Sequence, residues 1–307
     1  MTVEGVPGSG IVVIDKPRGP SSHQVTAWVG KILDVTVGHA GTLDPAVSGV
    51  LVVMLGSAVR LAPYLQRGEK EYLCLWRLHG DVPGARIVEV AKEFEGRIYQ
   101  RPPRKSAVKR ALRIRNVNRL EILEMEGRLV LLRVACDAGT YIRSLCHHMG
   151  IAAGPGGSMR ELRRTRSGSF TESDVHTLQE LEDAAYAARE GDVVPLQAMI
   201  LPVERGVADL PRISIRDTAA DALCHGASLA GVGVMNVEGT FAAGDPVGVF
   251  TQKGELVAIA LARVGSDALR PGSTGLVASP RVVFMNPDTY PRGWKKKRDR
   301  PVKGLNT

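Results

Sequence analysis

The chain has 307 residues, of which 44% are hydrophobic, so it is long enough for one large and one small globular domain. Its longest apolar runs, such as residues 50–55, are far too short to span a membrane, and its N-terminus lacks the charged and apolar regions of a secretory signal. The net charge of +8 favours a polyanionic partner such as nucleic acid, and four cysteines without a C-x-x-C pair indicate neither a zinc site nor a disulfide framework and fit a reducing cytoplasm.

The first predicted elements are a strand and a helix separated by a D-K-P-R-G-P block. The apolar residues 11–14 predict a short buried strand, which the prolines and glycine of the block end. Ser21 or Ser22 can cap a helix over residues 24–33, whose apolar residues recur on one face. Lys16 lies within the block and, on its own, is most simply interpreted as a solvated loop lysine.

The stretch G-H-A-G-T-L-D-P-A-V-S-G-V-L at residues 38–51 carries the strongest chemical signal. Its single carboxylate, Asp44, precedes a proline, which biases Asp44 towards an extended conformation, while the glycines permit tight backbone paths. Residues 50–55 predict a buried strand directly after it. An Asp-Pro pair is by itself usually only a turn. A carboxylate on a stiff loop beside a buried strand also suits a group that must face a ligand.

An aromatic strand and a basic segment follow. Residues 57–66 predict a helix, and residues 71–78 predict a strand that contains Tyr72, a position where an aromatic residue most often belongs to the core. Residues 101–119 hold eight Lys or Arg and no acid. Apolar residues are interleaved with these basic residues and can anchor them. We therefore interpret the segment as a loop and an extended stretch that faces nucleic acid.

A predicted hairpin leads to a second motif. Residues 121–126 and 129–136 predict two strands joined about Gly127. The string D-A-G-T-Y-I-R-S-L at residues 137–145 follows, and a helix is expected to run from it to about Met149.

The end of the first domain combines loops, basic residues and helices. The glycine-rich residues 154–157 lack the G-x-x-x-x-G-K-[ST] frame of a phosphate-binding loop and are interpreted as a connector. Residues 160–166 form a second basic cluster, which we expect to face RNA. Residues 173–190 are rich in Ala, Leu and Glu and predict a helical pair.

A domain boundary is expected near residues 207–211. Beyond it, residues 217–224 predict a short helix, and residues 244–250 and 256–264 predict two strands of a compact module. The expected organisation is a large first domain at residues 1–208, a small second domain at residues 209–286 and a basic tail at residues 287–307.

The motif at residues 38–51 resembles the catalytic-aspartate motif of the TruB-type pseudouridine synthases, G-H-x-G-x-L-D-P-x-x-x-G-x-L. The resemblance runs from about Ile14 to about Met285 and is nearest to the archaeal and eukaryotic branch, the dyskerin-like catalytic subunit of box H/ACA ribonucleoproteins. Further similar strings are D-K-P-x-G-x-S-S, K-E-Y, G-T-Y-I-R and L-R-R-T-R-x-G, which begin at residues 15, 70, 139 and 162.

The resemblance implies an α+β fold. The first domain would be a pseudouridine synthase catalytic domain with a mixed, mostly antiparallel sheet and flanking helices, and the second a small β-barrel-like PUA domain that binds RNA. It implies that Asp44 is the nucleophile, that Tyr72 stacks on the target base and that Arg143 pairs with Asp44. Isomerisation of uridine involves no redox step, so no cofactor and no metal is expected. The substrate-binding residues implied are His39, Tyr141, Leu162, Lys16 and Lys109, with Lys16 as a phosphate contact.

The function implied is RNA-guided isomerisation of uridines in ribosomal RNA, with transfer RNA left open as a further substrate. The partners implied are a box H/ACA guide RNA, the substrate RNA and three accessory proteins: a zinc-ribbon-like small subunit, a small barrel subunit and a kink-turn-binding ribosomal-type protein. The location implied is cytoplasmic. A short insertion between Lys109 and Leu120 favours the guided branch, whereas only about ten residues precede Ile11, so an N-terminal contribution to the PUA domain is expected to be missing or the start to be misplaced.

Three alternatives remain to be compared with this prediction. A stand-alone tRNA pseudouridine synthase that acts on the T-arm uridine shares the same catalytic core. A non-catalytic RNA-binding scaffold would not need Asp44, Tyr72 and Arg143 together. An Asp-based glycosidase needs a second carboxylate as general acid, and no paired acid is evident near Asp44.

Overall fold

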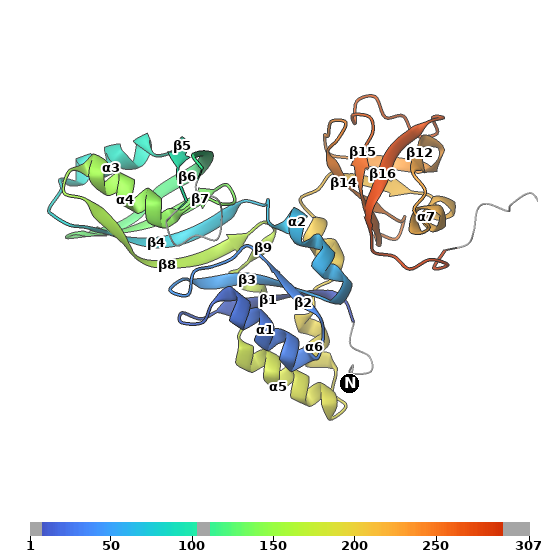
Figure 1. Ribbon diagram of the computed structural model, residues 1–307, viewed down its shortest axis with the longest axis horizontal. Coiled ribbons are helices and arrows are strands. Elements are labelled where there is room, and N and C mark those ends of the chain that lie inside the picture. The colour runs from blue at the N-terminus through green and yellow to red at the C-terminus, as the bar shows by residue number, and fades with distance from the viewer. Residues whose placement is uncertain (1–7, 103–110, 291–307) are drawn as a thin grey trace, which may run out of the picture. The chain divides into compact units, whose positions relative to one another are not determined.

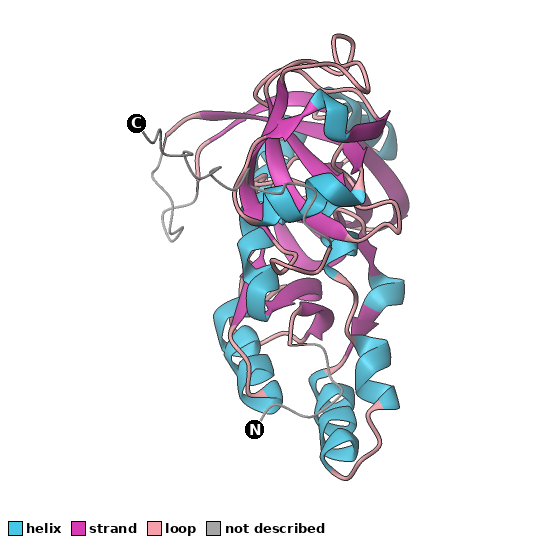
Figure 2. Ribbon diagram, turned by 90° about the vertical axis from the view of Figure 1, so that its right-hand side faces the viewer, coloured by secondary structure: helices cyan, strands magenta, loops and turns pink. Residues whose placement is uncertain are grey.

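A computed structural model describes residues 8–102 and 111–290, which divide into two compact units between Asp209 and Leu210. Each unit has its own sheet and its own buried core, with helices packed against strands (Figures 1 and 2). The α+β fold implied by the resemblance is therefore confirmed. Over the described ranges, no helix has the length and apolar character needed to cross a membrane.

The first unit contains a ten-stranded sheet with the order β10-β1-β3-β8-β4-β7-β6-β5, to which β2 adds beside β3 and β9 beside β8. Its neighbours are antiparallel except where β1 meets β10 and β3 meets β8, so the sheet of the described residues is mixed and mostly antiparallel. The strands are β1 (Gly10–Lys16), β2 (Val37–Ala40), β3 (Ser48–Leu55), β4 (Lys70–Leu78), β5 (Gly96–Gln100), β6 (Arg113–Glu126), β7 (Leu129–Cys136), β8 (Gly157–Ser167), β9 (Phe170–Thr171) and β10 (Val175–His176).

Two helix groups cover this sheet and form two separate cores. One core lies between β4, β6, β7 and the helices α3 and α4; the other lies between β1, β3 and the helices α1, α5 and α6. The helices are α1 (Ser22–Leu33), α2 (Ala62–Leu65), α3 (Gly84–Glu93), α4 (Ile142–Ala153), α5 (Leu178–Arg189) and α6 (Val194–Met199), with 3-10 turns η1 (Gly56–Leu61), η2 (Glu172–Asp174) and η3 (Val203–Val207).

The first helix begins as its sequence predicts. The side chain of Ser21 accepts a hydrogen bond from the backbone N–H of Gln24 at 3.1 Å, and the Gln24 side chain accepts one from the backbone of Ser21 at 2.9 Å. This reciprocal capping satisfies two backbone donors that the first helical turn leaves without partners. The helix then buries Val25 and Val29 against β1 and β3.

The region after the hairpin differs from its prediction. Residues 157–167 form a long strand, β8, although their charged residues had suggested only a basic cluster. Residues 173–190 do not form a helical pair, because they contain the short strand β10 and a single helix, α5. The sequence of β8 does not show the alternation of a strand, because its charged side chains find different partners: Arg163 binds carboxylates, whereas Arg164 binds backbone carbonyls.

The second unit is built on a six-stranded sheet with the order β12-β16-β15-β14-β11-β13. Strands β14 and β15 coincide closely with the two strands predicted here, and helix α7 coincides with the predicted short helix. Valine, isoleucine and alanine side chains of the sheet form its core. The elements are β11 (Arg212–Ile215), α7 (Asp217–Cys224), β12 (Leu229–Ala230), η4 (Gly231–Gly233), β13 (Val234–Glu238), β14 (Pro246–Phe250), β15 (Leu256–Ala262) and β16 (Leu276–Val283).

Candidate functional site

Asp44 lies on the loop between β2 and β3, which we call the Asp44 loop (residues 41–47). Its flanking residues Leu43 and Val47 are buried in the core formed with α3 and α4, whereas the strand that follows packs into the other core. The Asp44 side chain itself is 54% exposed. The loop therefore anchors its two apolar side chains and presents the carboxylate between them to solvent.

Backbone hydrogen bonds from two other segments fix this loop. The hydroxyl of Ser22, at the start of α1, donates to the carbonyl of Leu43 at 2.9 Å and accepts from its N–H at 2.8 Å. The ammonium of Lys16 donates to the carbonyl of Val47 at 2.8 Å and lies 3.4 Å from that of Pro45. Because these contacts use main-chain atoms, they hold the loop while leaving the carboxylate free to act.

Lys16 does not fit the role expected for it. Its side chain is fully buried, and its third hydrogen bond goes to the carbonyl of Pro17 at 2.8 Å. Burial, and then the nearby charge of Arg164, lower the pKa of its ammonium. A group enclosed by three carbonyls cannot also contact a phosphate, so Lys16 supports the Asp44 loop and is neither solvated nor a phosphate contact.

The structure brings Arg143 to Asp44 across 99 positions of sequence. Arg143 is the second residue of α4, and its guanidinium Nη2 donates to the carboxylate Oδ2 of Asp44 in a short contact. The neighbouring helix residues Ile142 and Leu145 are buried in the same core as Leu43, which fixes the start of α4 beside the loop. A planar guanidinium suits this position because it can bind a carboxylate with a defined orientation.

Tyr141 precedes that helix and is held by a residue that the sequence did not single out. The amide side chain of Gln100, at the end of β5, accepts a hydrogen bond from the N–H of Tyr141 at 2.9 Å and donates to its carbonyl at 3.2 Å. Gln100 is buried, and this two-way contact fixes the backbone at the point where α4 begins. A glutamine at the end of a strand has no sequence pattern that would predict this role, so sequence analysis missed Gln100.

Tyr72 lies on β4, directly across from Arg164 of β8 on one side and Val134 of β7 on the other. Its side chain is 9% exposed and belongs to the same core as Leu43 and Val47. Burial raises the pKa of its hydroxyl, and the nearby charge of Arg164 opposes the rise. Tyr72 thus has the expected core position and lies in the core that anchors the Asp44 loop.

The other predicted substrate-binding residues, His39, Leu162 and Lys109, differ in how the structure places them. His39 is half-buried on β2, and burial, followed by the charges of His23 and Arg164, lowers its pKa. Its Nδ1 atom is buried without a hydrogen-bond partner among the described residues. Leu162 of β8 is half-buried and packs against the core that contains Tyr72. Lys109 lies outside the described residues.

The second basic cluster is not a uniform RNA-facing surface. Arg163 forms hydrogen-bonded ion pairs with Asp15, at 2.8 and 3.0 Å, and with Glu172, at 2.6 Å. Arg166 pairs with Glu69. These contacts partly neutralise the two charges. Contact between residues 160–166 and RNA stays a prediction, in which Arg163 and Arg166 would bind RNA beside their carboxylate partners.

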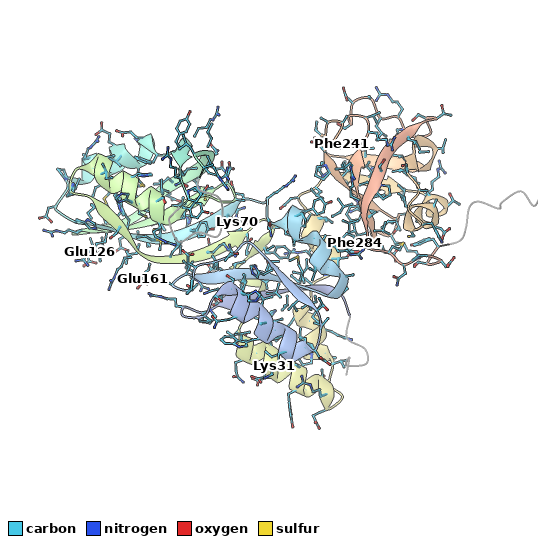
Figure 3. All side chains as sticks on the ribbon, viewed as in Figure 1. Lys31, Lys70, Glu126, Glu161, Phe241 and Phe284 are labelled. Atoms are coloured by element: carbon cyan, nitrogen blue, oxygen red, sulfur yellow. The ribbon has the colours of Figure 1, made fainter. Side chains whose placement is uncertain are left out.

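Lys70 is a second residue that sequence analysis missed. It begins β4, is buried, and donates to the carbonyl of Leu65 at 3.2 Å (Figure 3). Burial, assisted by the charge of Arg164 and opposed by that of Asp209, lowers the pKa of its ammonium to about 8. Charged residues at strand starts are common, so the sequence offers no sign that this one is enclosed.

The low pKa of Lys70 predicts a specific dependence of stability on pH. Between pH 8 and 10.5 the folded chain carries a neutral Lys70 while the unfolded chain still binds the proton, so the free energy of unfolding rises with pH in this window. Replacing Lys70 with Met should remove up to about 3 kcal/mol of that rise. Urea unfolding of both proteins from pH 7.5 to 10.5 measures it, and parallel curves would contradict the prediction.

A cavity of about 760 Å³ opens beside α4. Arg143 lines it together with the exposed side chains of Tyr99 and Leu112, whereas Asp44 and Tyr72 do not line it. Three imidazoles complete part of its wall, those of His79, His147 and His148. Arg143 therefore stands between the Asp44 carboxylate and a hollow that mixes aromatic, apolar and basic side chains.

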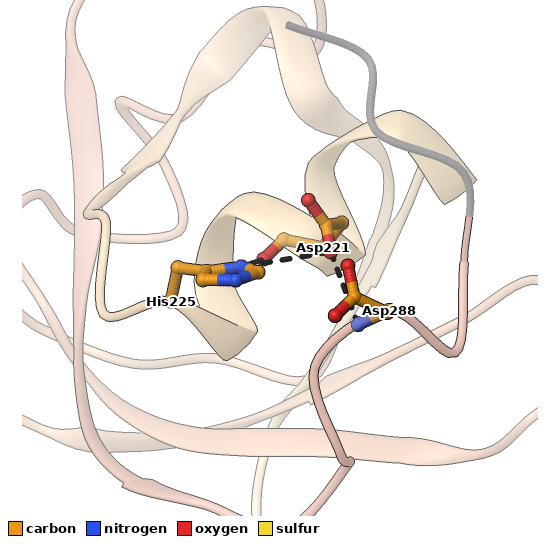
Figure 4. Close-up of side chains that lie close together, drawn as sticks. All are labelled: Asp221, His225 and Asp288. Carbon is orange, nitrogen blue, oxygen red and sulfur yellow. Dashed lines mark hydrogen bonds and ion pairs between the residues drawn. The ribbon is translucent and has the colours of Figure 1, made fainter.

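One group of described residues has the composition of a metal site. Ligand atoms of Asp221, His225 and Asp288, in the second unit, all lie within 4.8 Å of one another (Figure 4). The Asp221 carboxylate accepts a hydrogen bond from the N–H of Asp288 at 3.3 Å, and His225 Nδ1 contacts the Asp221 carbonyl at 2.9 Å. The cluster thus has hydrogen bonds of its own, and it contains no residue of the Asp44 site.

Family models match both units of the chain. The N-terminal domain of the TruB family pseudouridylate synthases matches residues 31–83 and 80–142. The C-terminal domain of tRNA pseudouridylate synthase B matches residues 143–208, and the PUA domain matches residues 211–284.

Individual proteins are similar over nearly the whole chain. A probable tRNA pseudouridine synthase B of Methanosarcina barkeri is 50% identical over 94% of this chain and 86% of its own length, and one of Methanothermobacter thermautotrophicus is 49% identical over 93% and 89%. A chain of a solved H/ACA RNP bound to a substrate RNA containing 2'-deoxyuridine has 46% identity and a TM-score of 0.88, with 93% of this chain and 88% of that chain covered. A chain of a Cbf5-Nop10-Gar1 complex has 48% identity and a TM-score of 0.89, with coverages of 92% and 87%. The chain therefore belongs to the TruB family and is a pseudouridine synthase, an isomerase that acts on uridine in RNA.

Proposed function

We propose that this chain is the catalytic subunit of a guide-directed ribonucleoprotein that isomerises selected uridines in ribosomal RNA. The observation that carries the proposal is the full-length similarity, both units included, to chains of the H/ACA RNP and the Cbf5-Nop10-Gar1 complex. In this proposal its partners are a guide RNA, the substrate RNA and small proteins of the Nop10 and Gar1 kinds, together with the kink-turn-binding protein that the sequence resemblance adds. The second unit, as a PUA domain, holds an end of the guide.

In this proposal the reaction uses three side chains of the first unit. Isomerisation breaks the C1′–N1 bond of uridine and forms a C1′–C5 bond, while C5 loses a proton and N1 gains one. Asp44 is the nucleophile, and its exposed carboxylate on a fixed loop suits a nucleotide that has been turned out of its stack. Arg143 orients that carboxylate, and Tyr72 stacks on the detached uracil while it rotates.

The other proposed contacts serve the substrate. Tyr141 and Leu162 wall the base pocket, and His39 approaches the target strand from β2. The cavity beside Arg143 is the proposed place for the RNA next to the target uridine. The exposed Tyr99 in its wall can stack on a base there. Lys109 remains a proposed RNA contact from the basic segment.

A second candidate function has an observation of its own. The curated relatives carry the name tRNA pseudouridine synthase B, which favours a stand-alone enzyme for transfer RNA. The two candidates differ in their need for a guide. Tritium released from C5-labelled uridine is measured with ribosomal RNA fragments and with transfer RNA, each with and without the guide and accessory proteins. Turnover of ribosomal RNA only in the complete mixture supports the guided enzyme, and equal turnover of transfer RNA by the chain alone supports the other.

The proposed guide contact of the second unit predicts a change in salt dependence. Removing residues 210–307 should weaken guide binding and flatten the fall of affinity with salt, because fewer phosphates are neutralised. The first unit should stay folded, since the two cores described for it are built from its own strands and helices. Filter binding from 50 to about 200 mM salt measures both quantities.

The matched control is the full-length Asp44→Asn variant, which keeps every basic residue and should bind the guide like the unmodified chain. Equal affinity and equal slope for the truncated and full-length proteins would show that the second unit does not bind the guide.

A further inference from the structure

Arg164 is a buried cation, with 1% of the residue exposed, and it reaches both ends of the Asp44 loop. Its Nη2 donates to the carbonyl of Gly41 at 2.9 Å, where the loop begins. Its Nε donates to the carbonyl of Val50 at 2.8 Å, just after the loop has entered β3. One planar guanidinium therefore closes the base of the loop that presents Asp44.

The backbone around Arg164 is equally close. Strands β3 and β8 pair in parallel at Gly49 and Arg164, and a Cβ atom on Gly49, where φ is +101°, would lie 2.2 Å from the carbonyl oxygen of Arg164. A Cβ on Gly41, where φ is +79°, would lie 3.3 Å from Nη1 of Arg164. Glycine is therefore required for this approach at one position and favoured at the other. The two glycines let the loop and the guanidinium come together.

Arg164 also lies next to Tyr72. The two residues are directly opposite each other on β8 and β4, and the charge of Arg164 is close enough to oppose the rise in the pKa of Tyr72. Strand β8 lies between the strand that follows Asp44 and the strand that carries Tyr72. The Arg164 side chain thus binds the Asp44 loop and the start of β3, and its backbone pairs with the strand position of Tyr72.

Its electrostatic setting is unusual for a structural arginine. Within residues 8–102 and 111–290, Arg164 forms no ion pair, while Arg163, one position earlier, binds two carboxylates. A buried cation without a carboxylate partner costs folding free energy, and an apolar side chain of similar size would avoid that cost. The charge of Arg164 also acts on its neighbours, because it adds to the lowering of the pKa values of Lys16 and Lys70 by burial and opposes the rise in the pKa of Tyr72.

We infer that Arg164 is a positioning residue of the isomerisation, which holds the Asp44 loop in a fixed place beside the strand that carries Tyr72. The inference rests on the catalytic roles proposed above for Asp44 and Tyr72, and it does not depend on whether a guide is used. A lysine at position 164 keeps the charge but lacks the planar fork whose two separate nitrogens donate to the carbonyls of Gly41 and Val50. A methionine removes both the charge and the donors.

The test compares Arg164→Lys and Arg164→Met with the matched variants Arg163→Lys and Arg163→Met, in the full-length chain with the RNA mixture that the unmodified chain converts. Single-turnover tritium release should fall about 100-fold in Arg164→Lys, the effect expected when a reacting group is displaced by about 1 Å. RNA affinity should stay within about threefold, because phosphate contacts dominate it. The Arg163 variants should keep nearly full rates.

A direct readout of Tyr72 separates positioning from general damage. Carbon-13 labelling of tyrosine, with the resonance assigned from Tyr72→Phe, follows the Tyr72 titration by NMR. Its pKa should rise in Arg164→Met and remain unchanged in both Arg163 variants, because the charge of Arg164, and not that of Arg163, opposes the rise that burial causes. Circular dichroism establishes that each variant is folded. Should Arg164→Met not fold, Gly41→Ala gives the second perturbation, and it should lower the single-turnover rate with Arg164 in place.

The outcomes distinguish this inference from the proposed function. Full single-turnover rates in Arg164→Lys or in Gly41→Ala, beside an inactive Asp44→Asn, overturn the role of Arg164 alone. An unchanged Tyr72 titration in a folded Arg164→Met variant also overturns it. Turnover retained in Asp44→Asn overturns the assignment of Asp44 as the nucleophile. The positioning role of Arg164, which depends on that assignment, is then overturned as well.

Discussion

Asp44→Asn should lower pseudouridine formation by about 10⁴-fold, a loss of the size seen when an active-site aspartate becomes an asparagine of nearly the same shape. The substitution removes the charge of the proposed nucleophile and preserves its volume. The loop should keep its conformation, because Ser22 and Lys16 bind its backbone and not the carboxylate. RNA affinity should remain within about threefold of the unmodified value, since phosphate contacts supply most of it.

Tritium release from C5-labelled uridine measures the turnover, and filter binding measures the affinity. Asp81→Asn is a matched control, because Asp81 is also an exposed aspartate that pairs with an arginine, Arg128, at 2.7 and 3.1 Å. It should have no effect on turnover. Turnover above about one tenth of normal in Asp44→Asn would remove Asp44 from the role of nucleophile.

Much of the local structure around Asp44 could be predicted because it depends on short-range signals. The proline after Asp44, the buried strand that follows and the capping serine before α1 each act through neighbouring residues, and the structure has all three. The family resemblance placed Arg143 beside Asp44 from a motif 99 positions away, and the structure has the two side chains paired.

The support for the site could not be predicted in the same way. Arg163 and Arg164 are adjacent and chemically identical, yet one binds two carboxylates and the other is buried beneath the Asp44 loop. The side chains of successive strand residues point to opposite faces of the sheet. Their different surroundings can therefore be predicted only when β8 is known to be a strand and its neighbouring strands are known. Lys16 was misjudged for a related reason, because its enclosure depends on carbonyls that arrive from the Asp44 loop.

Arg143→Lys should lower the single-turnover rate about 100-fold, because the charge is kept but the planar fork that orients the Asp44 carboxylate is lost. The fold should be unaffected, since the Arg143 side chain is 48% exposed and exposed ion pairs contribute little to stability. Thermal unfolding and tritium release together test this, with Arg128→Lys as the control for loss of an equally exposed guanidinium that also pairs with an aspartate. If Arg143 served only as a contact for RNA phosphates, lysine would replace it with little loss, because an ammonium binds phosphate as a point charge. A rate within about threefold of normal for Arg143→Lys would therefore assign Arg143 to phosphate binding, whereas the expected loss ties the orientation of Asp44 to the start of α4.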